Sequence, residues 1–271
     1  MGHKAFSTED TTGGVVAIGY RALKFQNADS TSYNTAVGYQ AGENVTTGSQ
    51  NTLFGGLAGD TLTTGSFNIA LGFAALTTED TGNKNVAIGR NALYNLNYDG
   101  DGYNVAVGHQ AGENISTGTH NVLLGGLSGD ALTTGVGNIA IGYESLSAED
   151  GNGKNVAVGH KTLKYQNAGA DAYNVAVGYQ AGINVSTGAD NTIIGGLAGD
   201  ALTTGALNVA VGKAALGSED TGSANVAIGH AALMNQNYDG NAYNTAVGHN
   251  AGTSVTTGIQ NTIIGGLAGD A

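Results

Sequence analysis

The sequence predicts an all-β fold, a parallel β-solenoid, from three observations. A pattern of Asn, a β-branched residue, a small residue, a bulky apolar residue and Gly recurs along the chain, as in residues 174–178. The sequence numbers of the glycines that close the pattern rise in repeating steps of 19, 17, 17 and 17, which together make a 70-residue superperiod. The chain has 47 glycines and no proline, which suits a continuous ladder of backbone hydrogen bonds. A fixed repeat of this kind is typical of solenoids.

We call the closing glycines marker glycines and expect one 17- or 19-residue coil for each. They are Gly2, Gly19, Gly38, Gly55, Gly72, Gly89, Gly108, Gly125, Gly142, Gly159, Gly178, Gly195, Gly212, Gly229, Gly248 and Gly265. Residues 1–271 are thus predicted to form one solenoid domain. Gly2 is already in register, and the chain stops part-way through a unit at Ala271. The pattern therefore suggests a segment cut at both ends from a longer array.

The three residues before each marker glycine are predicted to form a strand, because β-branched and bulky apolar residues favour strands. The first and third residues share one face, and the second residue shares the other face with the glycine. The larger face is expected to fill the coil. The smaller face is expected to pack against another copy of the chain, because a strand that is apolar on both sides is usually covered on both. The predicted interface residues are Ala36, Gly38, Ala106, Gly108, Ala176, Gly178, Ala246 and Gly248.

The second half of each unit is predicted to supply one bulky core residue at one of two places. A small residue lies three positions after the marker glycine, and the next residue is Leu in some units and Gly in others, as in Leu23 and Gly42. Units of the Gly kind carry a bulky residue three positions later, such as Val45 or Leu62. This pattern predicts a short second strand and a flattened coil. Asn precedes the strand in nearly every unit, which predicts a stacked ladder of side-chain amides.

Long irregular segments occur only in the 19-residue units, at residues 25–33, 94–103, 165–173 and 234–243. They hold many of the aromatic and polar residues that break the repeat, including Asp29 and Asp171. Aromatic faces beside polar groups suit a sugar or a protein surface, so these loops are the predicted ligand-binding elements. The candidate residues are Tyr33, Tyr98, Asp99, Tyr103, Tyr173, Tyr238, Asp239 and Tyr243.

Composition and residue pattern argue against several functional classes. A formal net charge of −12 argues against nucleic acid, whose binding needs Lys and Arg. No run of apolar residues is long enough for a membrane helix, and with no cysteine there are no disulfides. The chain carries no Cys nucleophile, no Gly-x-Ser-x-Gly sequence and no phosphate-binding loop, so we expect no enzymatic activity and no cofactor.

Recurring acidic and histidine residues are the candidate metal ligands. Asp60, Asp130, Asp200 and Asp270 form one column, and Glu-Asp pairs recur at 9–10, 79–80, 149–150 and 219–220. Clustered carboxylates suit Ca²⁺, but acidic residues also cap turns without a metal, and we predict that second role. His109, His160, His230 and His249 share their register with Tyr, Arg and Lys, which a metal site would not tolerate. We therefore expect a half-exposed packing column and no metal site.

The repeated Asn-Val-Ala-Ile-Gly pattern, as in residues 85–89 and 225–229, resembles the YadA-like head repeat of trimeric autotransporter adhesins. Similar repeats occur in phage tail-fibre proteins. The resemblance covers essentially the whole chain, although these units are longer than the family's usual ones and no neck, coiled-coil stalk or membrane anchor is recognisable. It implies a left-handed β-roll, a homotrimer and a role in surface attachment.

The predicted function is therefore structural and adhesive: a segment of a trimeric fibre that mediates or presents attachment to a host surface protein or glycan. The expected location is extracellular, on an outer-membrane-anchored fibre at the cell surface or on a virion, with no membrane insertion by this segment. Two alternatives are a phage tail-fibre spacer that binds nothing itself and a calcium-binding β-roll.

Overall fold

The computed structural model describes residues 3–6, 13–28 and 31–270, and this part of the chain forms fifteen short strands and no helix. Each strand has three residues and ends immediately before a marker glycine, as predicted. The strands are β1 (Val16–Ile18), β2 (Thr35–Val37), β3 (Thr52–Phe54), β4 (Ile69–Leu71), β5 (Val86–Ile88), β6 (Val105–Val107), β7 (Val122–Leu124), β8 (Ile139–Ile141), β9 (Val156–Val158), β10 (Val175–Val177), β11 (Thr192–Ile194), β12 (Val209–Val211), β13 (Val226–Ile228), β14 (Thr245–Val247) and β15 (Thr262–Ile264). The predicted parallel β-solenoid is confirmed.

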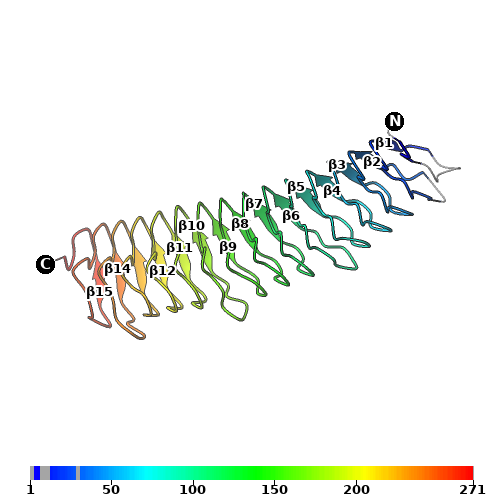
Figure 1. Cartoon of the computed structure of the whole chain (residues 1–271). Coiled ribbons are helices and arrows are strands. Elements are labelled where there is room, and N and C mark those ends of the chain that lie inside the picture. Colours follow the sequence, from blue (N-terminus) through cyan, green and yellow to red (C-terminus); the bar gives the residue numbers. More distant parts are fainter. Residues whose placement is uncertain (1–2, 7–12, 29–30, 271) are drawn as a thin grey trace. The chain divides into compact units, whose positions relative to one another are not determined.

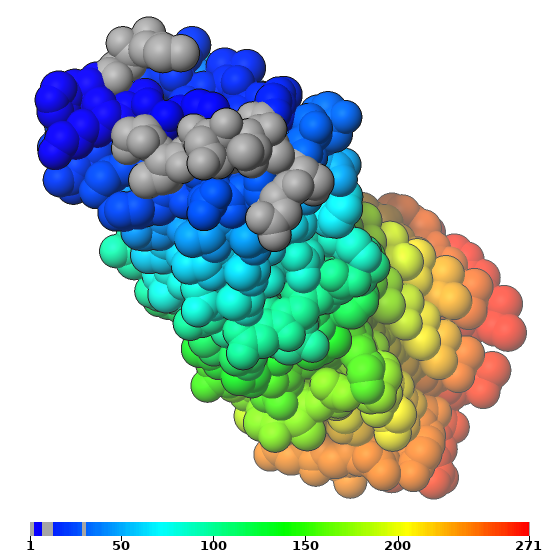
Figure 2. Space-filling model, turned by 90° about the vertical axis from the view of Figure 1, so that its right-hand side faces the viewer, coloured from blue at the N-terminus to red at the C-terminus, as the bar shows by residue number. Residues whose placement is uncertain are grey.

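The chain divides into two compact units, Met1–Gly137 and Asn138–Ala271. In the first unit β1 to β7 pair in chain order, all parallel and without a register shift, so that Val16 pairs with Thr35 and Val105 with Val122. The second unit repeats this arrangement from β8 to β15. Within each unit the coils lie one on the next as rungs (Figure 1), and the space-filling view shows them packed band against band (Figure 2). Residues at one position of the repeat therefore form columns.

The side chains of the strands point in the opposite direction to the one predicted. In β2 to β14 the middle residue is buried, while the first and third residues are half-buried or exposed. The predicted interface alanines Ala36, Ala106, Ala176 and Ala246 are 0% exposed within the single chain. They fill the inside of the coil, so no other copy can reach them and the predicted assignment of these side chains to an interface is wrong.

The marker glycines are small for a reason that also lies within one chain. A Cβ atom on Gly38 would lie 2.3 Å from the carbonyl oxygen of Gly55 in the next rung, and the φ of Gly38 is +146°. The same conflict recurs at Gly108, where the Cβ would lie 2.3 Å from the Gly125 oxygen, and at Gly178 and Gly248 against Gly195 and Gly265. These four predicted interface glycines therefore permit close stacking of rungs and do not need a partner chain to explain them.

The predicted second strand is also wrong, although the core residues assigned to that half of the unit are correct. Among the described residues this half is a turn that places ordinary residues at positive φ, for example Arg21 at 57° and Leu23 at 47°. Leu23, like its equivalents in other Leu-kind units, is fully buried. In the Gly-kind units the bulky residue three positions later, such as Val45 or Leu62, is fully buried instead, except for Val255 in the last coil, which is half-buried. The described coils of these two kinds thus take a large core side chain from the turn, and the coil with Leu93 also buries Leu96.

A glycine after the buried small residue makes room for a larger strand residue. Where the middle strand residue is Leu53 rather than Ala, a Cβ on Gly42 would approach its Cδ1 atom to 2.6 Å, and a Cβ on Gly59 would approach its Cδ2 atom to 2.9 Å. Leu123 stands in the same relation to Gly112 and Gly129. Because the interior of a coil is small and close-packed, an added strand side chain requires space from the facing turns.

The predicted stack of asparagines is present, and it bonds mainly to the backbone. Asn51 N donates to Asn34 Oδ1 at 2.8 Å, and Asn68 N donates to Asn51 Oδ1 at 2.9 Å. The Asn51 amide nitrogen donates to the Gly65 carbonyl at 2.9 Å. Direct amide-to-amide bonds occur at some rungs, such as Asn121 to Asn104 at 3.2 Å. Asn51 therefore satisfies two backbone groups, whose burial without partners would cost free energy.

Some residues of the predicted pattern lie outside the described part of the chain. They are the pair Glu9 and Asp10, together with Met1, Gly2, Asp29 and Ala271. No helix in the described part is long and apolar enough to cross a membrane.

Candidate functional site

The outward face of the strands is an apolar surface, which we call the outer strip. In the first unit it consists of the first and third residues of β1 to β7, and in the second unit of those of β8 to β15; within each unit they share one side because strand side chains alternate. The third position is apolar throughout and includes Ile18, Phe54 and Ile194, which are 51%, 57% and 39% exposed. No strand position carries a charge in a chain whose net charge is −12.

The outer strip runs unbroken through each unit because the strands pair in register. Thr35, Thr52, Thr192, Thr245 and Thr262 are its polar members, all at first positions. Contiguous exposed apolar surface is uncommon on monomeric soluble proteins and marks a surface that another molecule covers. The strip repeats the same kinds of side chain from strand to strand and carries no charge. It therefore suits contact with another apolar surface and presents no acid, base or nucleophile of the usual catalytic types.

Two of the predicted ligand-binding tyrosines belong to surface clusters that the sequence did not reveal. Lys84 Nζ lies 2.6 Å from Asp101 Oδ2 and 2.9 Å from Tyr103 Oη. Lys154 Nζ repeats these contacts at 2.5 Å to Asp171 Oδ2 and 3.1 Å to Tyr173 Oη. Hydrogen bonding to the carboxylate raises the pKa of Lys84 and lowers that of Asp101. In both pairs the lysine precedes its aspartate by 17 residues, the length of one short repeat. This spacing places the two residues on adjacent rungs, and it could have been used to predict the pairs from the sequence.

The other predicted loop residues are exposed or half-buried. Thr81 donates to Asp99 at 2.6 Å, and Thr221 donates to Asp239 at 2.8 Å. Tyr33, Tyr98 and Tyr243 are 64%, 36% and 55% exposed. Asn241 donates to the Tyr243 hydroxyl at 3.1 Å. These hydrogen bonds lie within a loop or reach the preceding rung.

The Glu residues of the acidic pairs anchor these loops. Glu79 is fully buried and its carboxylate accepts hydrogen bonds from the backbone nitrogens of Gly82 at 2.7 Å and Tyr98 at 3.2 Å. Glu219 binds Gly222 at 2.7 Å and Tyr238 at 3.3 Å. Burial raises the pKa of both carboxyls, while these backbone donors oppose the rise. The acidic pairs therefore serve as turn caps that hold Tyr98 and Tyr238 in place.

The column after the marker glycine consists largely of stacked rings. Tyr20 and Tyr39 stack with centroids 5.4 Å apart, and His160 stacks between Tyr143 at 5.6 Å and Tyr179 at 5.4 Å. Exposed fractions of 37% for Tyr20 and 56% for Tyr39 agree with the predicted partly exposed packing column. In the described residues no group of three or more His, Cys, Asp or Glu side chains could hold a metal ion.

Asp60 gives the stability of the chain a predicted pH dependence. Burial raises the pKa of its carboxyl from 3.8 to about 6, and the charge of Glu43 adds to the rise. The unfolded chain therefore loses this proton first, so the free energy of unfolding falls as the pH rises from 3.8 to about 6 and then levels off. Asp60→Asn removes the charge, and we expect it to melt at a higher temperature than the wild type at about pH 8 and equally near pH 3.

Circular dichroism melts at both pH values check this prediction, with Glu144→Gln as a control of opposite sign. A hydrogen bond from Lys164 lowers the pKa of Glu144. Its contribution is present above the unfolded pKa and lost as the pH falls through the folded one, so this variant should be slightly less stable at about pH 8. An Asp60→Asn protein that melts below the wild type at alkaline pH would refute the account of Asp60.

Comparisons with protein families, curated proteins and solved structures found no match to this chain.

Proposed function

We propose that the chain is a structural and adhesive segment of a homotrimeric fibre in which the outer strips of three copies face one another. The observation that carries this proposal is the uncharged apolar strip on the outside of the coil, where Ile18, Phe54 and Ile194 are among the exposed apolar side chains. Removing apolar surface from water contributes roughly 25 cal/mol per Å². Because every strand adds two residues to the strip, the apolar area that a partner could cover extends along the whole of each unit.

A second copy of the same chain is the partner that suits the strip best. The rungs of every copy have the same spacing, so parallel copies keep their side chains in register over many rungs. Val, Ile, Leu, Phe and Thr at the strip positions are compatible with the same residues on another copy, because no charge has to be paired. The number three, and the left-handed sense of the coil, follow from the resemblance to YadA-like head repeats.

The attachment role rests on the surface that such a trimer leaves free. The long loops with Tyr98, Tyr103, Tyr173 and Tyr238 lie outside the strands, and Glu79 and Glu219 fix two of them. A fibre that repeats weak sites along three chains gains avidity from multivalency. The location would be a cell surface or a virion. A passive spacer is the second candidate, because Lys84, Asp101 and Tyr103 already satisfy one another.

Light scattering coupled to size-exclusion chromatography tests the assembly. We expect a molar mass three times the 26.9 kDa of the chain, independent of concentration over the micromolar range. A mass of one chain would contradict the proposal, and a mass of two chains would contradict the trimer while retaining the strip as an interface.

A further inference from the structure

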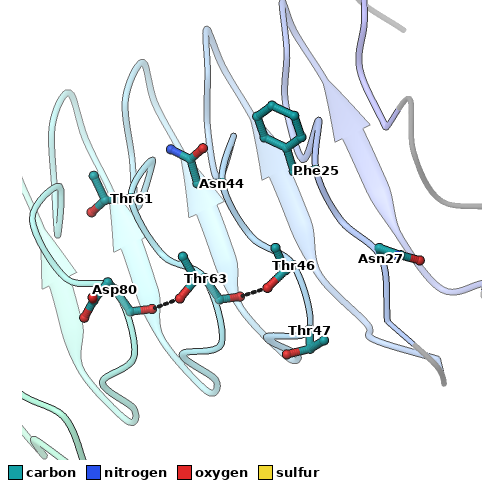
Figure 3. Close-up of a pocket in the computed structure, with 8 residues that line it drawn as sticks. All are labelled: Phe25, Asn27, Asn44, Thr46, Thr47, Thr61, Thr63 and Asp80. Carbon is teal, nitrogen blue, oxygen red and sulfur yellow. Dashed lines mark hydrogen bonds between the residues drawn. The ribbon is translucent and has the colours of Figure 1, made fainter.

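A hollow of about 810 Å³ lies on the turn side of the first unit, away from the residues of the outer strip. Figure 3 shows its lining residues in two rows that run along the stack of rungs. The upper row consists of Phe25, Asn44 and Thr61, which come from the turns after β1, β2 and β3. Because its lining residues come from successive rungs, the hollow is a groove that runs along the stack of rungs. Such a groove suits an extended ligand.

The lower row of the hollow consists of Asn27, Thr46, Thr63 and Asp80 (Figure 3). Thr46 Oγ1 donates its proton to the Thr63 carbonyl at 3.1 Å, and Thr63 Oγ1 donates to the Asp80 carbonyl at 3.0 Å. The hydroxyl protons are thus used inside the protein, while a hydroxyl oxygen can still accept a hydrogen bond. The groove therefore offers acceptors along its length.

Two further groups add to the acceptor character of the groove. Asn44 uses its amide nitrogen on the Asp60 carbonyl at 2.8 Å, which leaves its Oδ1 as an acceptor. Asp80 Oδ1 is buried and has no hydrogen-bond partner. Asp80 also lines the hollow, so its carboxylate places negative charge beside the acceptors of the groove. A ligand that complements these acceptors would carry several hydroxyl groups, spaced closely enough to donate to acceptors on successive rungs.

An aromatic ring stands at one end of these acceptors. Phe25 is 39% exposed although it lines the hollow. The Lys24 ammonium lies 3.9 Å from the centroid of the ring, and it also lies 3.7 Å from Glu43. A ring beside hydroxyl acceptors is the combination that a pyranose sugar requires, because its C–H face packs on the ring while its hydroxyls donate hydrogen bonds. Lys24 would repel a cationic ligand at the ring, and Asp80 would repel an anionic one.

The second unit repeats most of the residues of this groove two superperiods further along the chain. Tyr165, 50% exposed, takes the position of Phe25, with Lys164 Nζ 5.3 Å from its ring centroid. Asn184 Nδ2 donates to the Asp200 carbonyl at 2.7 Å, as Asn44 does to Asp60. Ser186 donates to the Thr203 carbonyl at 3.1 Å and Thr203 to the Asp220 carbonyl at 3.0 Å. The second unit therefore carries the aromatic ring and most of the acceptors, with Ala201 in the position of Thr61.

We infer that the groove of the first unit and the equivalent surface of the second bind neutral oligosaccharide chains, with Phe25 and Tyr165 as the stacking platforms. The inference rests on the proposed attachment function and names its ligand class and its site, which differs from the loop tyrosines predicted from the sequence. One groove has modest affinity, and repetition along the chain and across copies raises the avidity.

Isothermal titration of the full chain with linear tetrasaccharides tests the inference. The probes are neutral tetramers of glucose, galactose, mannose and N-acetylglucosamine, with a sulfated and a sialylated oligosaccharide and spermine as comparisons. We expect saturable binding of at least one neutral tetramer, and no binding of the anionic sugars or spermine. The double variant Phe25→Ala/Tyr165→Ala should lose at least about tenfold in affinity, or about 1.4 kcal/mol. Phe67→Ala removes a ring that is 49% exposed outside the hollow and should bind as the wild type does.

Circular dichroism shows that each variant is folded before it is titrated. Failure to bind any neutral tetramer, a preference for the charged probes, or unchanged affinity in the double variant would each overturn the inference. Molar mass is measured on the same samples, which separates the two proposals. A trimer that binds no sugar overturns the groove alone, and a single chain that binds sugar through Phe25 and Tyr165 overturns the trimer alone.

Discussion

Replacing Gly55 by alanine is expected to destabilise the first unit severely. A Cβ atom at this position would lie 2.3 Å from the Gly72 carbonyl oxygen and 2.6 Å from its carbonyl carbon, and the φ of Gly55 is +139°. The clash is with backbone, so no side-chain rotation can relieve it, and L-residues also avoid this conformation. The two rungs would have to separate, which breaks the ladder between β3 and β4. We expect a loss of more than about 4 kcal/mol or failure to fold, measured by urea unfolding.

The neighbouring glycine gives a matched control for this substitution. A Cβ on Gly56 would meet Phe73 Cδ2 at 3.5 Å, an ordinary contact with a side chain that can move. Gly56→Ala should therefore unfold at nearly the wild-type urea concentration. If Gly55→Ala and Gly56→Ala unfold at the same urea concentration, close stacking of the rungs does not require glycine at the marker position.

A pair of carboxylates on the outer strip is expected to dissociate the fibre segment. Val177 and Ile194 occupy the third positions of adjacent strands β10 and β11 and are 36% and 39% exposed in the single chain. Val177→Asp/Ile194→Asp would place six unpaired charges between three copies, and burying like charges costs several kcal/mol. In one chain alone the same groups remain in water, so the coil itself should persist. We expect a molar mass of one chain with an unchanged β-sheet circular dichroism spectrum.

Asn167→Asp/Ala170→Asp supplies a control for this variant, because it adds two carboxylates at exposed loop positions and leaves the strip intact. It should keep the mass of the wild type. A Val177→Asp/Ile194→Asp protein that retains the full assembly mass would show that the strip is not the contact between copies.

Much of the coil could be predicted from the sequence because the repeat fixes which residues share a column. The strand position, the Asn stack and the alternation between Leu23 and Val45 as core residues all follow from spacing. The prediction of the inward face is wrong because a large side chain does not mark the interior of a coil this short. Such a coil encloses little space, and Leu23 or Val45 from the turn already fills it. The strand can then contribute only Ala36 inward and must turn Val37 outward.

The second strand and the loop contacts required information that the local sequence does not carry. Arg21, Leu23 and Gln40 have positive φ values, although none of them is a Gly or Asn, the residue types from which positive φ is normally predicted. The rung stacking imposes them and so produces a turn where apolar spacing indicated a strand. The sugar-binding groove likewise depends on contacts between rungs, such as that of Thr46 with Thr63, which no local pattern reveals.

Thiol labelling tests most directly whether the outer strip is covered in solution. The chain has no cysteine, so a single Ile194→Cys substitution places one thiol on the strip and Ala170→Cys places a reference thiol on an exposed loop. Labelling needs access to the thiolate. If copies cover the strip, the cysteine at position 194 reacts with a maleimide dye at least about tenfold more slowly than the one at position 170, and it reacts at the loop rate once Val177→Asp separates the copies. Equal labelling rates in the otherwise wild-type protein would show a strip that faces water, and would contradict the account.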